Sequence, residues 1–426
     1  MNMMYLSLGI FAVMYVCLLI FTEQRWMIAM FAAAIFMAIG ILPVGDSLLA
    51  VNWNVILMLL GTMITVELFI QSKMPALMAE KLLKMTPNVK WAVIVLSLFS
   101  GLISAFVDNV ATVLMLAPIG LAVSKKLNTN PVPVIISIAV SSNLQGAATL
   151  VGDTTSILLG SYADMGFNDF FWFLGRPGIC FAVEAGAIMT VPVLMILFRK
   201  EKKKVTSEIT TKVTDYLPTV LLLGTIGLLI AASQFPDKPA LTNGIICVGL
   251  GLFGTIAEWL RHRGERVKFL KSVLDAIDIK TLLLLTGLFM VIEGITEAGV
   301  IDEIAKLFVK AGGDSPLVMY ILIVSVSVAL SAFIDNIPYV ATMLPVVTGI
   351  AGIMGIEPYL FDYGLLIGAT LGGNITPVGA SANITGIGIL QKEGYKVRNR
   401  DFLRIGIPFT LVAAVAGAAV VWIFWA

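Results

Sequence analysis

Two stretches of this chain, Ser104-Ala105-Phe106-Val107-Asp108-Asn109-Val110 and Ser331-Ala332-Phe333-Ile334-Asp335-Asn336-Ile337, read almost alike and lie 227 positions apart. Each places an aspartate and an asparagine inside an apolar segment. The same offset relates residues 149–157 to residues 376–384. Two motif pairs that share one offset predict a duplicated unit. Duplicated halves with polar, Gly/Pro-broken apolar segments are typical of secondary transporters.

The composition is that of a membrane protein. Of the 426 residues, 58% are hydrophobic and 13% are charged, and the mean hydropathy is +0.97, which no soluble domain needs. All three cysteines lie in apolar runs and the one histidine, His262, lies in a basic loop. We therefore expect neither a disulfide framework nor a His-based metal or nucleophile site. Residues 1–5 carry no basic side chain, which favours a first span over a cleaved signal.

We predict an all-α polytopic membrane fold of two inverted repeats, each with five transmembrane helices and one re-entrant helical hairpin. The first repeat covers residues 1–198 and the second covers 216–426, joined by a basic cytoplasmic linker at 199–215. The expected hairpins are 91–126 and 315–351, and the expected broken helices are 132–160 and 361–390. Each hairpin would turn at its Asp-Asn pair, because an interruption at membrane depth is tolerated only where it lines a cavity or is buried in protein. The alternative is two further full spans in each half.

Segments that are apolar and about 20 residues long can cross the bilayer. The other spans that this length predicts are roughly 3–22, 26–43, 52–70, 177–198, 216–233, 240–260, 281–299 and 403–425. Residues 74–84 and 302–310 have apolar positions at helical spacing with Lys and Glu between them. We expect two short interfacial helices there, leading into the hairpins.

The placement of basic residues predicts the orientation. If both hairpins return to their own side, one face holds all of the 28 Lys and Arg residues except Arg176, Lys238, Lys306 and Lys310. The positive-inside rule makes that face cytoplasmic. We therefore expect a multi-pass protein of the inner (plasma) membrane with both termini outside the cytoplasm. An odd number of crossings per half also requires the halves to be inverted.

Acidic residues inside the predicted spans indicate the chemistry of the site. The acids well inside these spans, with no Lys or Arg among them, are Glu67, Asp108, Asp153, Glu184, Glu293 and Asp335. An acid at the bilayer centre costs about 2.5–3.5 kcal/mol, so we expect these residues to face a polar interior or to be protonated. Their natural partners are then protons, Na⁺, or hydroxyl and amide groups. The roles of Glu67, Glu184 and Glu293 are left open.

The hairpin tips are the sharpest candidates for an ion site. At a tip, the arriving helix presents unpaired carbonyls and the departing helix presents free N–H groups. Asp108, Asn109, Asp335 and Asn336 would add carboxylate and amide oxygens there, a set that suits Na⁺. The alternative is that each Asp simply caps the departing helix.

The broken helices supply further polar groups. The first carries Thr149, Asp153 and Thr154, and the second carries Thr376, Ser381 and Asn383. The halves differ at one position, where Asp153 corresponds to Ala380. A third carboxylate on one side only suggests an asymmetric site for a coupling ion or proton. The alternative is a buried Asp that is bonded to neighbouring Thr hydroxyls.

At these residues the chain resembles the ion transporter superfamily, in particular its ArsB/NhaD branch of arsenite permeases, NhaD-type sodium–proton antiporters and P protein-like transporters. The segments that carry the resemblance, besides the two tips, are 146–156 and 372–383. It covers nearly the whole chain. The resemblance implies a homodimer in which a transport domain moves past a scaffold domain as an elevator. It also implies that substrate or ions bind at Asp108, Asn109, Thr149, Asp153, Thr154, Asp335, Asn336, Thr376, Ser381 and Asn383.

The chain departs from some of these relatives. Many have Gly-Asp-Pro-Pro-Asn in the first unwound span, where this chain has Gly152-Asp153-Thr154-Thr155-Ser156. Dicarboxylate-type relatives carry Ser-Asn-Thr at the tips, where this chain has Asp-Asn-Val and Asp-Asn-Ile. Both differences argue against a citrate or succinate carrier.

We therefore expect a secondary active transporter, and not an enzyme, that moves a small ion using a Na⁺ or H⁺ gradient: either Na⁺/H⁺ antiport or efflux of an arsenite-type oxyacid. The alternative is Na⁺-coupled carboxylate symport, and more remote alternatives are a passive channel and an intramembrane aspartyl protease. We expect no cofactor beyond the coupling ion and no nucleic-acid partner. The expected partners are the lipid bilayer, the small ion and a second copy of the chain. The chain has no ATP-binding pattern of its own, and a cytoplasmic ATPase partner is left open.

Overall fold

The computed structural model describes residues 3–205, 211–213, 215–235, 237–261 and 264–426. His262 and part of the predicted linker at 199–215 therefore lie outside the described residues. The described chain is almost entirely helical. The α-helices of its first half are α1 (Met3–Ile20), α2 (Arg25–Ala38), α3 (Val44–Ser47), α4 (Trp53–Gln71), α5 (Met74–Lys84), α6 (Val89–Ser104), α7 (Asn109–Lys126), α8 (Pro131–Gln145), α9 (Thr154–Tyr162) and α10 (Ile179–Leu197).

The second half repeats this order of long and short helices. Its α-helices are α11 (Leu217–Ala232), α12 (Thr242–Arg261), α13 (Arg266–Asp275), α14 (Ile279–Glu297), α15 (Val300–Gly312), α16 (Pro316–Ser331), α17 (Asn336–Met354), α18 (Tyr359–Gly372), α19 (Ser381–Lys392) and α20 (Asn399–Trp425). Short 3₁₀ turns occur at Thr22–Gln24, Gly146–Ala148 and Asn168–Phe170, and strands β1 (Trp172–Phe173) and β2 (Arg176–Pro177) form a small antiparallel hairpin.

The breaks fall where the polar motifs predict them. α6 and α7 are interrupted at residues 105–108, and α16 and α17 are interrupted at residues 332–335. The two broken helices appear as α8 with α9, and as α18 with α19. By length and composition, eight helices of the described chain can cross a membrane, or nine if the bent pair α15–α16 counts as one span. The protein is thus a mostly helical, multi-pass membrane protein. α17 is among those eight helices, so the re-entrant course of the second hairpin stays a prediction.

Helices from the two halves pack closely at glycines. A Cβ atom on Gly61 of α4 would collide with the backbone of Cys247 in α12. In the same way, a Cβ atom on Gly287 of α14 would meet the backbone of Ala29 in α2, at 2.7 Å from its carbonyl carbon. Small residues permit such close approach of membrane helices. The two halves are therefore joined by two tight helix pairs, α4 with α12 and α2 with α14.

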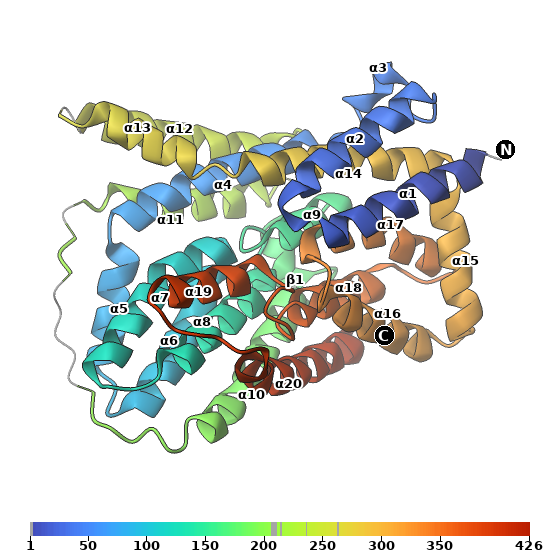
Figure 1. Ribbon diagram of the computed structural model, residues 1–426. Helices are drawn as coiled ribbons and strands as arrows, with labels where there is room; N and C mark the ends of the chain where they lie inside the picture. The colour runs from blue at the N-terminus through green and yellow to red at the C-terminus, as the bar shows by residue number, and fades with distance from the viewer. Residues whose placement is uncertain (1–2, 206–210, 214, 236, 262–263) are drawn as a thin grey trace.

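The helices form two layers (Figure 1). In the view of Figure 1, α2, α4, α12, α13 and α14 run along the top, and we call these helices, together with α1 and α11, the upper layer. The lower layer consists of α6–α10 and α16–α20. α5 and α15 lie at opposite ends of the molecule and lead from the upper layer into the lower one. Both hairpins and both broken helices belong to the lower layer.

Within the lower layer, α18 packs closely on α16. A Cβ atom on Gly368 would lie 2.6 Å from Cβ of Ser327 and 2.8 Å from the carbonyl oxygen of Val324. A Cβ atom on Gly372 would meet the carbonyl oxygen of Val328 at 2.5 Å. The glycines of this segment therefore let α18 approach the backbone of α16.

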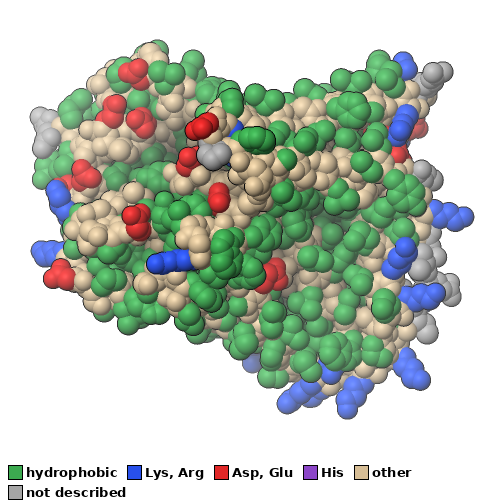
Figure 2. Space-filling view, turned by 180° about the vertical axis from the view of Figure 1, so that it is seen from behind, with side chains coloured by type: hydrophobic (Ala, Val, Ile, Leu, Met, Phe, Trp, Pro, Cys, Tyr) green, Lys and Arg blue, Asp and Glu red, His purple; other side chains and the backbone are tan. Residues whose placement is uncertain are grey.

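Basic side chains gather toward one edge of the molecule, on the right and lower right in Figure 2. In Figure 1 this edge is on the left, where α5 and the chain that follows α10 lie. Broad apolar surfaces cover the face between the edges (Figure 2). The uneven distribution of charge agrees with the sequence-based expectation of one basic face.

Candidate functional site

Each hairpin tip is closed by its aspartate in the same way. The Asp108 side chain caps α7, and its Oδ1 accepts hydrogen bonds from the backbone N–H groups of Val110 at 2.9 Å and Ala111 at 3.2 Å. Asp335 caps α17, and its Oδ1 accepts from the N–H of Ile337 at 3.2 Å. An Asp at this position satisfies N–H groups that have no partner within the helix. Both aspartates therefore cap the departing helices, as the alternative expected. In each of them the capping hydrogen bonds use only Oδ1.

Asp153 links the two halves. It caps α9 through Oδ1, which accepts from the N–H of Thr154 at 2.7 Å. Its Oδ2 accepts from the hydroxyl of Thr155 at 3.0 Å and from the amide of Asn336 at 3.2 Å. A carboxylate of the first broken helix is thus hydrogen-bonded to the second tip.

A cavity of about 310 Å³ opens at this place, between the layers. It is lined by parts of α4, α7 and α9, by the segment before α14, and by the starts of α17 and α19. Of the predicted site residues, those that line it are Asp108, Asn109, Asp153, Thr154, Asn336 and Ser381. Residues of both tips and both broken helices therefore share one cavity, although Asp335 is not part of its lining.

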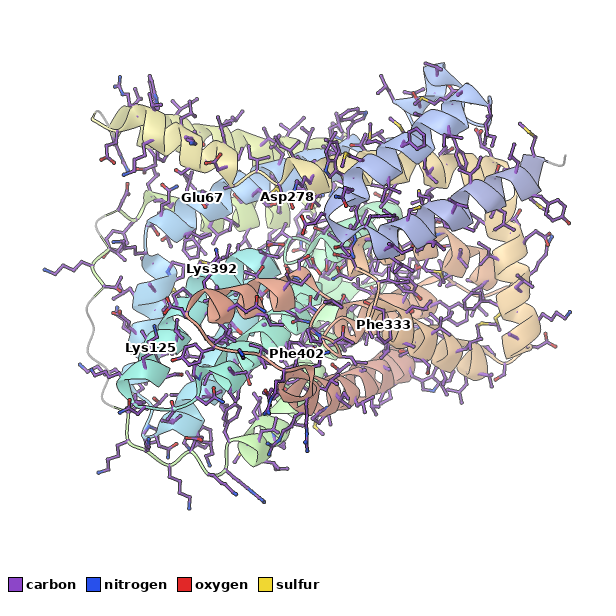
Figure 3. All side chains as sticks on the ribbon, in the orientation of Figure 1. Glu67, Lys125, Asp278, Phe333, Lys392 and Phe402 are labelled. Carbon is purple, nitrogen blue, oxygen red and sulfur yellow. The ribbon has the colours of Figure 1, made fainter. Side chains whose placement is uncertain are left out.

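The cavity is acidic. Its lining includes Glu67, Asp275 and Asp278 in addition to Asp108 and Asp153, and none of the described residues that line it is Lys or Arg. Figure 3 shows Glu67 and Asp278 in the upper layer. A water-filled concavity with one sign of charge raises the local concentration of the opposite ion. The arrangement can therefore attract and hold a cation. Asp275 ends α13 and Asp278 caps α14. Both lie outside the spans predicted from the sequence, so neither was among the predicted site residues.

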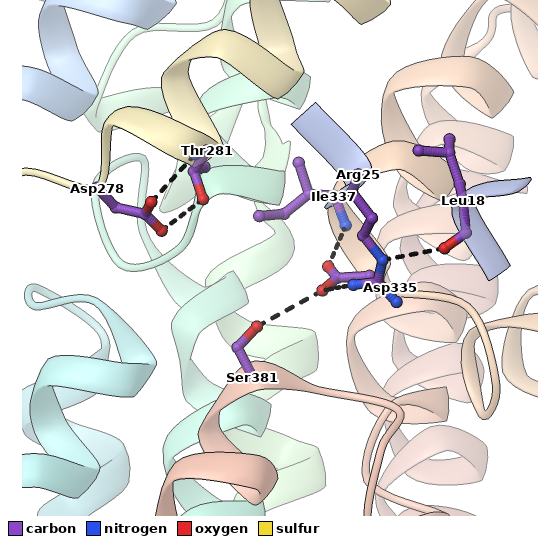
Figure 4. Close-up of polar contacts among 7 residues, drawn as sticks. All are labelled: Leu18, Arg25, Asp278, Thr281, Asp335, Ile337 and Ser381. Carbon is purple, nitrogen blue, oxygen red and sulfur yellow. Dashed lines mark hydrogen bonds and ion pairs between the residues drawn. The ribbon is translucent and has the colours of Figure 1, made fainter. Parts of the chain in front are cut away.

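The expectation that no basic side chain lies near the tips is wrong for the second tip. The Nη1 atom of Arg25, the first residue of α2, lies 2.8 Å from Oδ2 of Asp335 (Figure 4). Ser381 donates to the same oxygen at 3.5 Å. Arg25 lies in a loop between two predicted spans, and the packing of the layers brings it to the tip. Asp335 is thus neutralised by an ion pair, whereas Asp108 has no such pair among the described residues.

The threonines of the broken helices fasten them to the hairpins. The hydroxyl of Thr149 donates to the carbonyl oxygen of Ala105, and the hydroxyl of Thr376 donates to that of Ala332. These carbonyls lie at the ends of the arriving hairpin helices. Carbonyl groups at a helix end have no hydrogen-bond donor within the helix. Asn383 donates to the carbonyl oxygens of Gly373 at 2.9 Å and Thr376 at 3.1 Å. None of these three side chains lines the cavity, so the structure places them as supports around it.

A buried amide network behind the tips was not found from the sequence. Asn109 donates to Asn143 at 2.9 Å, and Asn143 donates to Oδ1 of Asn374 at 3.1 Å and to the carbonyl oxygen of Thr370 at 2.7 Å. Asn374 in turn donates to the carbonyl oxygen of Val140 at 2.9 Å. Asn143 and Asn374 are completely buried. The signal was available, because Asn143 is an amide side chain inside an apolar segment.

The remaining acids within the spans have different surroundings. Glu67 lines the cavity, and Glu184 is half-buried in α10. Glu293 is exposed on α14 and does not line the cavity. Asp362 in α18 is buried, and its Oδ1 has no hydrogen-bond partner among the described residues. It lies in the first turn of α18, at the edge of the predicted segment 361–390, so it was not among the acids well inside a span.

Comparisons with known proteins agree on the class of this chain. A model of the citrate transporter family matches residues 15–362. An uncharacterized transporter of Mycobacterium tuberculosis is 31% identical over 433 residues, which cover 99% of each chain. The human P protein is 27% identical over 448 residues, which cover 86% of this chain and 53% of the P protein.

A solved structure has the same fold. The YdaH transporter of Alcanivorax borkumensis superimposes with a TM-score of 0.61 at 14% identity, and the match covers 89% of this chain and 86% of that one. The resemblance to the ion transporter superfamily is confirmed, and P protein is among the relatives. With a family model that spans most of its length, this chain belongs to the citrate transporter family of membrane transporters.

Proposed function

We propose that the protein is a secondary active transporter that moves a small ion at the expense of a Na⁺ or H⁺ gradient, as a Na⁺/H⁺ antiporter or an exporter of an arsenite-type oxyacid. The observation that carries this proposal is the acidic cavity between the two layers. Asp108, Asp153 and Asn336 meet there at the ends of interrupted helices, and the described lining has no basic side chain. Such a site is built to hold a cation.

In this proposal the coupling cation binds between Asp108 and Asp153. Oδ1 of Asp108 caps α7, and the other oxygen is available to the cation. Asn109, Thr154 and Asn336 line the same cavity and would supply further oxygen ligands. Asp335 would take part when it is released from Arg25. No cofactor beyond the coupling ion is needed.

The transport movement would be of the elevator type. The layer with hairpins and broken helices would slide past the layer of α2, α4, α12 and α14. The matched order of helices in the two halves and the matched glycine contacts support an origin in two inverted repeats. A homodimer in the inner (plasma) membrane, with both termini outside the cytoplasm, fits this arrangement. The gathering of basic residues toward one edge supports that orientation.

Proteoliposomes with an internal pH dye test the proposal. They are challenged in turn with Na⁺, Li⁺, arsenite and succinate. Proton movement that is evoked by Na⁺ or Li⁺ alone identifies an antiporter, and movement evoked by arsenite identifies oxyacid efflux. Asp108→Asn should abolish the coupled flux while the protein remains folded. Full coupled flux in Asp108→Asn, or downhill flux without coupling in the parent protein, contradicts the proposal.

A second candidate is Na⁺-coupled carboxylate symport. It is favoured by the description of the family, which names citrate transport. Arg25 also provides a basic side chain near a tip, although it is paired with Asp335 and lies outside the cavity lining. Uptake of labelled citrate that requires Na⁺ and is unaffected by a collapse of the pH gradient would support this candidate. The acidic lining requires that the cation binds before the carboxylate.

A further inference from the structure

The guanidinium of Arg25 reaches the second hairpin tip from the opposite layer. Its Nε donates to the carbonyl oxygen of Leu18 at 3.2 Å, which fixes the side chain to the end of α1. Its Nη1 then meets Oδ2 of Asp335 at 2.8 Å (Figure 4). The side chains of Arg25 and Asp335 are only 16% and 12% exposed. The ion pair is thus largely shielded from water, and it connects the upper layer to the lower one.

The two tips of the duplicated motif are therefore in different states. Asp108 and Asp335 occupy the same position of the motif, and both cap the next helix with Oδ1. Oδ2 of Asp335 is taken by a cation that belongs to the protein, whereas Asp108 faces the acidic cavity. A guanidinium keeps its charge at any pH that a protein survives, so Arg25 cannot leave Asp335 by losing a proton. If it leaves, Asp335 keeps an uncompensated buried charge unless another positive charge replaces the guanidinium.

A second, uncharged contact joins the same two elements. The hydroxyl of Tyr15 in α1 donates to the carbonyl oxygen of Pro338 at 2.9 Å and lies 3.1 Å from Oγ1 of Thr342. Both partners belong to the first turns of α17. The start of α17 is thus held against α1 and α2 by one charged contact and one neutral contact, and these two contacts can be removed separately.

We propose that Arg25 is a tethered counter-cation that locks the second tip to the upper layer, and that a monovalent cation at Asp335 displaces its guanidinium and frees the layers to move. This inference rests on the proposed function and assigns to Arg25 a positioning role. While the tip is locked, the guanidinium of Arg25 balances the charge of Asp335 without a bound ion, and the lower layer stays in place. When Na⁺ or Li⁺ replaces the guanidinium, the charge of Asp335 stays balanced and the lock opens. Ion binding at the second tip is thereby coupled to movement.

The test measures the distance between the tip and the loop before α2. Phe21 and Phe333 are exposed at these two places and are replaced by spin-labelled cysteines, in full-length protein whose Cys17, Cys180 and Cys247 are changed to Ala. Distance distributions are recorded in lipid nanodiscs, in choline chloride and in NaCl of equal ionic strength. The parent protein should show mainly a short distance in choline, with a minor population of a longer distance that grows in Na⁺.

Arg25→Gln should show the longer distance in choline as well, with a population about fivefold that of the parent, and should respond little to Na⁺. Asp335→Asn should behave like Arg25→Gln. Arg25→Lys keeps the positive charge but lacks the planar guanidinium with its several N–H donors. It should show a population of the short distance between those of the parent and of Arg25→Gln. Tyr15→Phe is the matched control, because it removes the neutral contact between the same elements and should keep the response to Na⁺.

An Arg25→Gln protein that keeps the short distance in choline and still responds to Na⁺ overturns the lock. So does a Tyr15→Phe protein that loses the response to Na⁺ as completely as Arg25→Gln does. The proteoliposome assay is read separately. A parent protein that moves neither Na⁺ nor H⁺ overturns the proposed antiport, while the distances of Arg25→Gln in choline still decide whether Arg25 holds the tip.

Discussion

Thr149 and Thr376, 227 positions apart, make the same hydrogen bond, each to the carbonyl oxygen of an alanine at the end of a hairpin's arriving helix. Both alanines and both threonines are buried. The bond joins a broken helix to a hairpin in each half, so that these two elements hold their positions around the cavity together. The same substitution can therefore be made at the matched position of each half, and the two effects on stability can be compared.

Removing either hydroxyl should loosen its own half. We expect Thr149→Val and Thr376→Val each to lower stability by about 1–3 kcal/mol, because a buried carbonyl loses its partner. The measurement is thermal unfolding in detergent. Thr149→Ser and Thr376→Ser keep the hydroxyl and serve as controls, with smaller losses expected. Valine variants as stable as the serine variants would show that the bond contributes nothing.

The contact between Asp153 and Asn336 should appear as an energetic coupling. Single and double replacements of these residues by alanine form a double-mutant cycle, and residues in contact typically couple by about 0.5–3 kcal/mol. The cycle is read from unfolding and, separately, from the Na⁺ concentration that gives half-maximal flux. Asn336 with Thr155 is a second cycle, in which both residues contact the same oxygen of Asp153. Additive effects of Asp153→Ala and Asn336→Ala in both measurements would rule out a working link between the halves.

Asp275 and Asp278 should attract the cation without binding it directly. Neutralising them in Asp275→Asn/Asp278→Asn should raise the half-maximal Na⁺ concentration at low ionic strength by about tenfold or less, and the effect should shrink as an inert salt is added. The maximal rate should change little. Asp302→Asn removes an exposed acid on α15, away from the cavity, and should leave the Na⁺ dependence unaltered. An effect that does not depend on salt would indicate direct ligation instead.

The amide network should be essential for stability. Asn143→Leu removes an acceptor for Asn109 and donors to Thr370 and Asn374, and leaves several buried polar groups unpaired. We expect a loss of at least about 2–3 kcal/mol, since each unsatisfied buried group costs about 1–3 kcal/mol. The readout is the unfolding midpoint together with the yield of folded protein. Ser137 is buried in the same helix, so Ser137→Ala provides a matched loss of one side-chain bond.

Two glycine substitutions should change the stability of the protein in opposite directions. Gly368→Ala would push a methyl group against Ser327 and Val324, so α18 must move away from α16 and stability should fall by about 1–3 kcal/mol. Gly249 lies in α12 with nothing near its Cβ position, and Gly249→Ala should raise helix stability by up to about 1 kcal/mol. Unfolding in detergent compares the two. Equal behaviour would mean that close helix packing does not depend on Gly368.

Much of this fold follows from local rules. The Asp-Asn pairs mark where α7 and α17 begin, because a carboxylate is needed where N–H groups lose their helical partners. Apolar segment length located nearly all the long helices, and Asp153 was selected because it is an acid inside such a segment. These local rules do not predict how the helices of the two layers pack against one another. The partner of Arg25, the exposure of Glu293 and the acids before α14 depend on how separate helices dock, and no local pattern records this.

The packing of α2 and α4 against helices of the second half has a consequence for the order of assembly during synthesis. In the part of the chain that the structure describes, α2 packs against α14 at Ala29, and α4 packs against α12 at Gly61. When the ribosome has finished α10, both partner helices are still unmade. The early helices must therefore wait in the lipid, loosely associated, until the later ones insert. We therefore expect these two helix pairs to form late in synthesis, and neither half to mature alone.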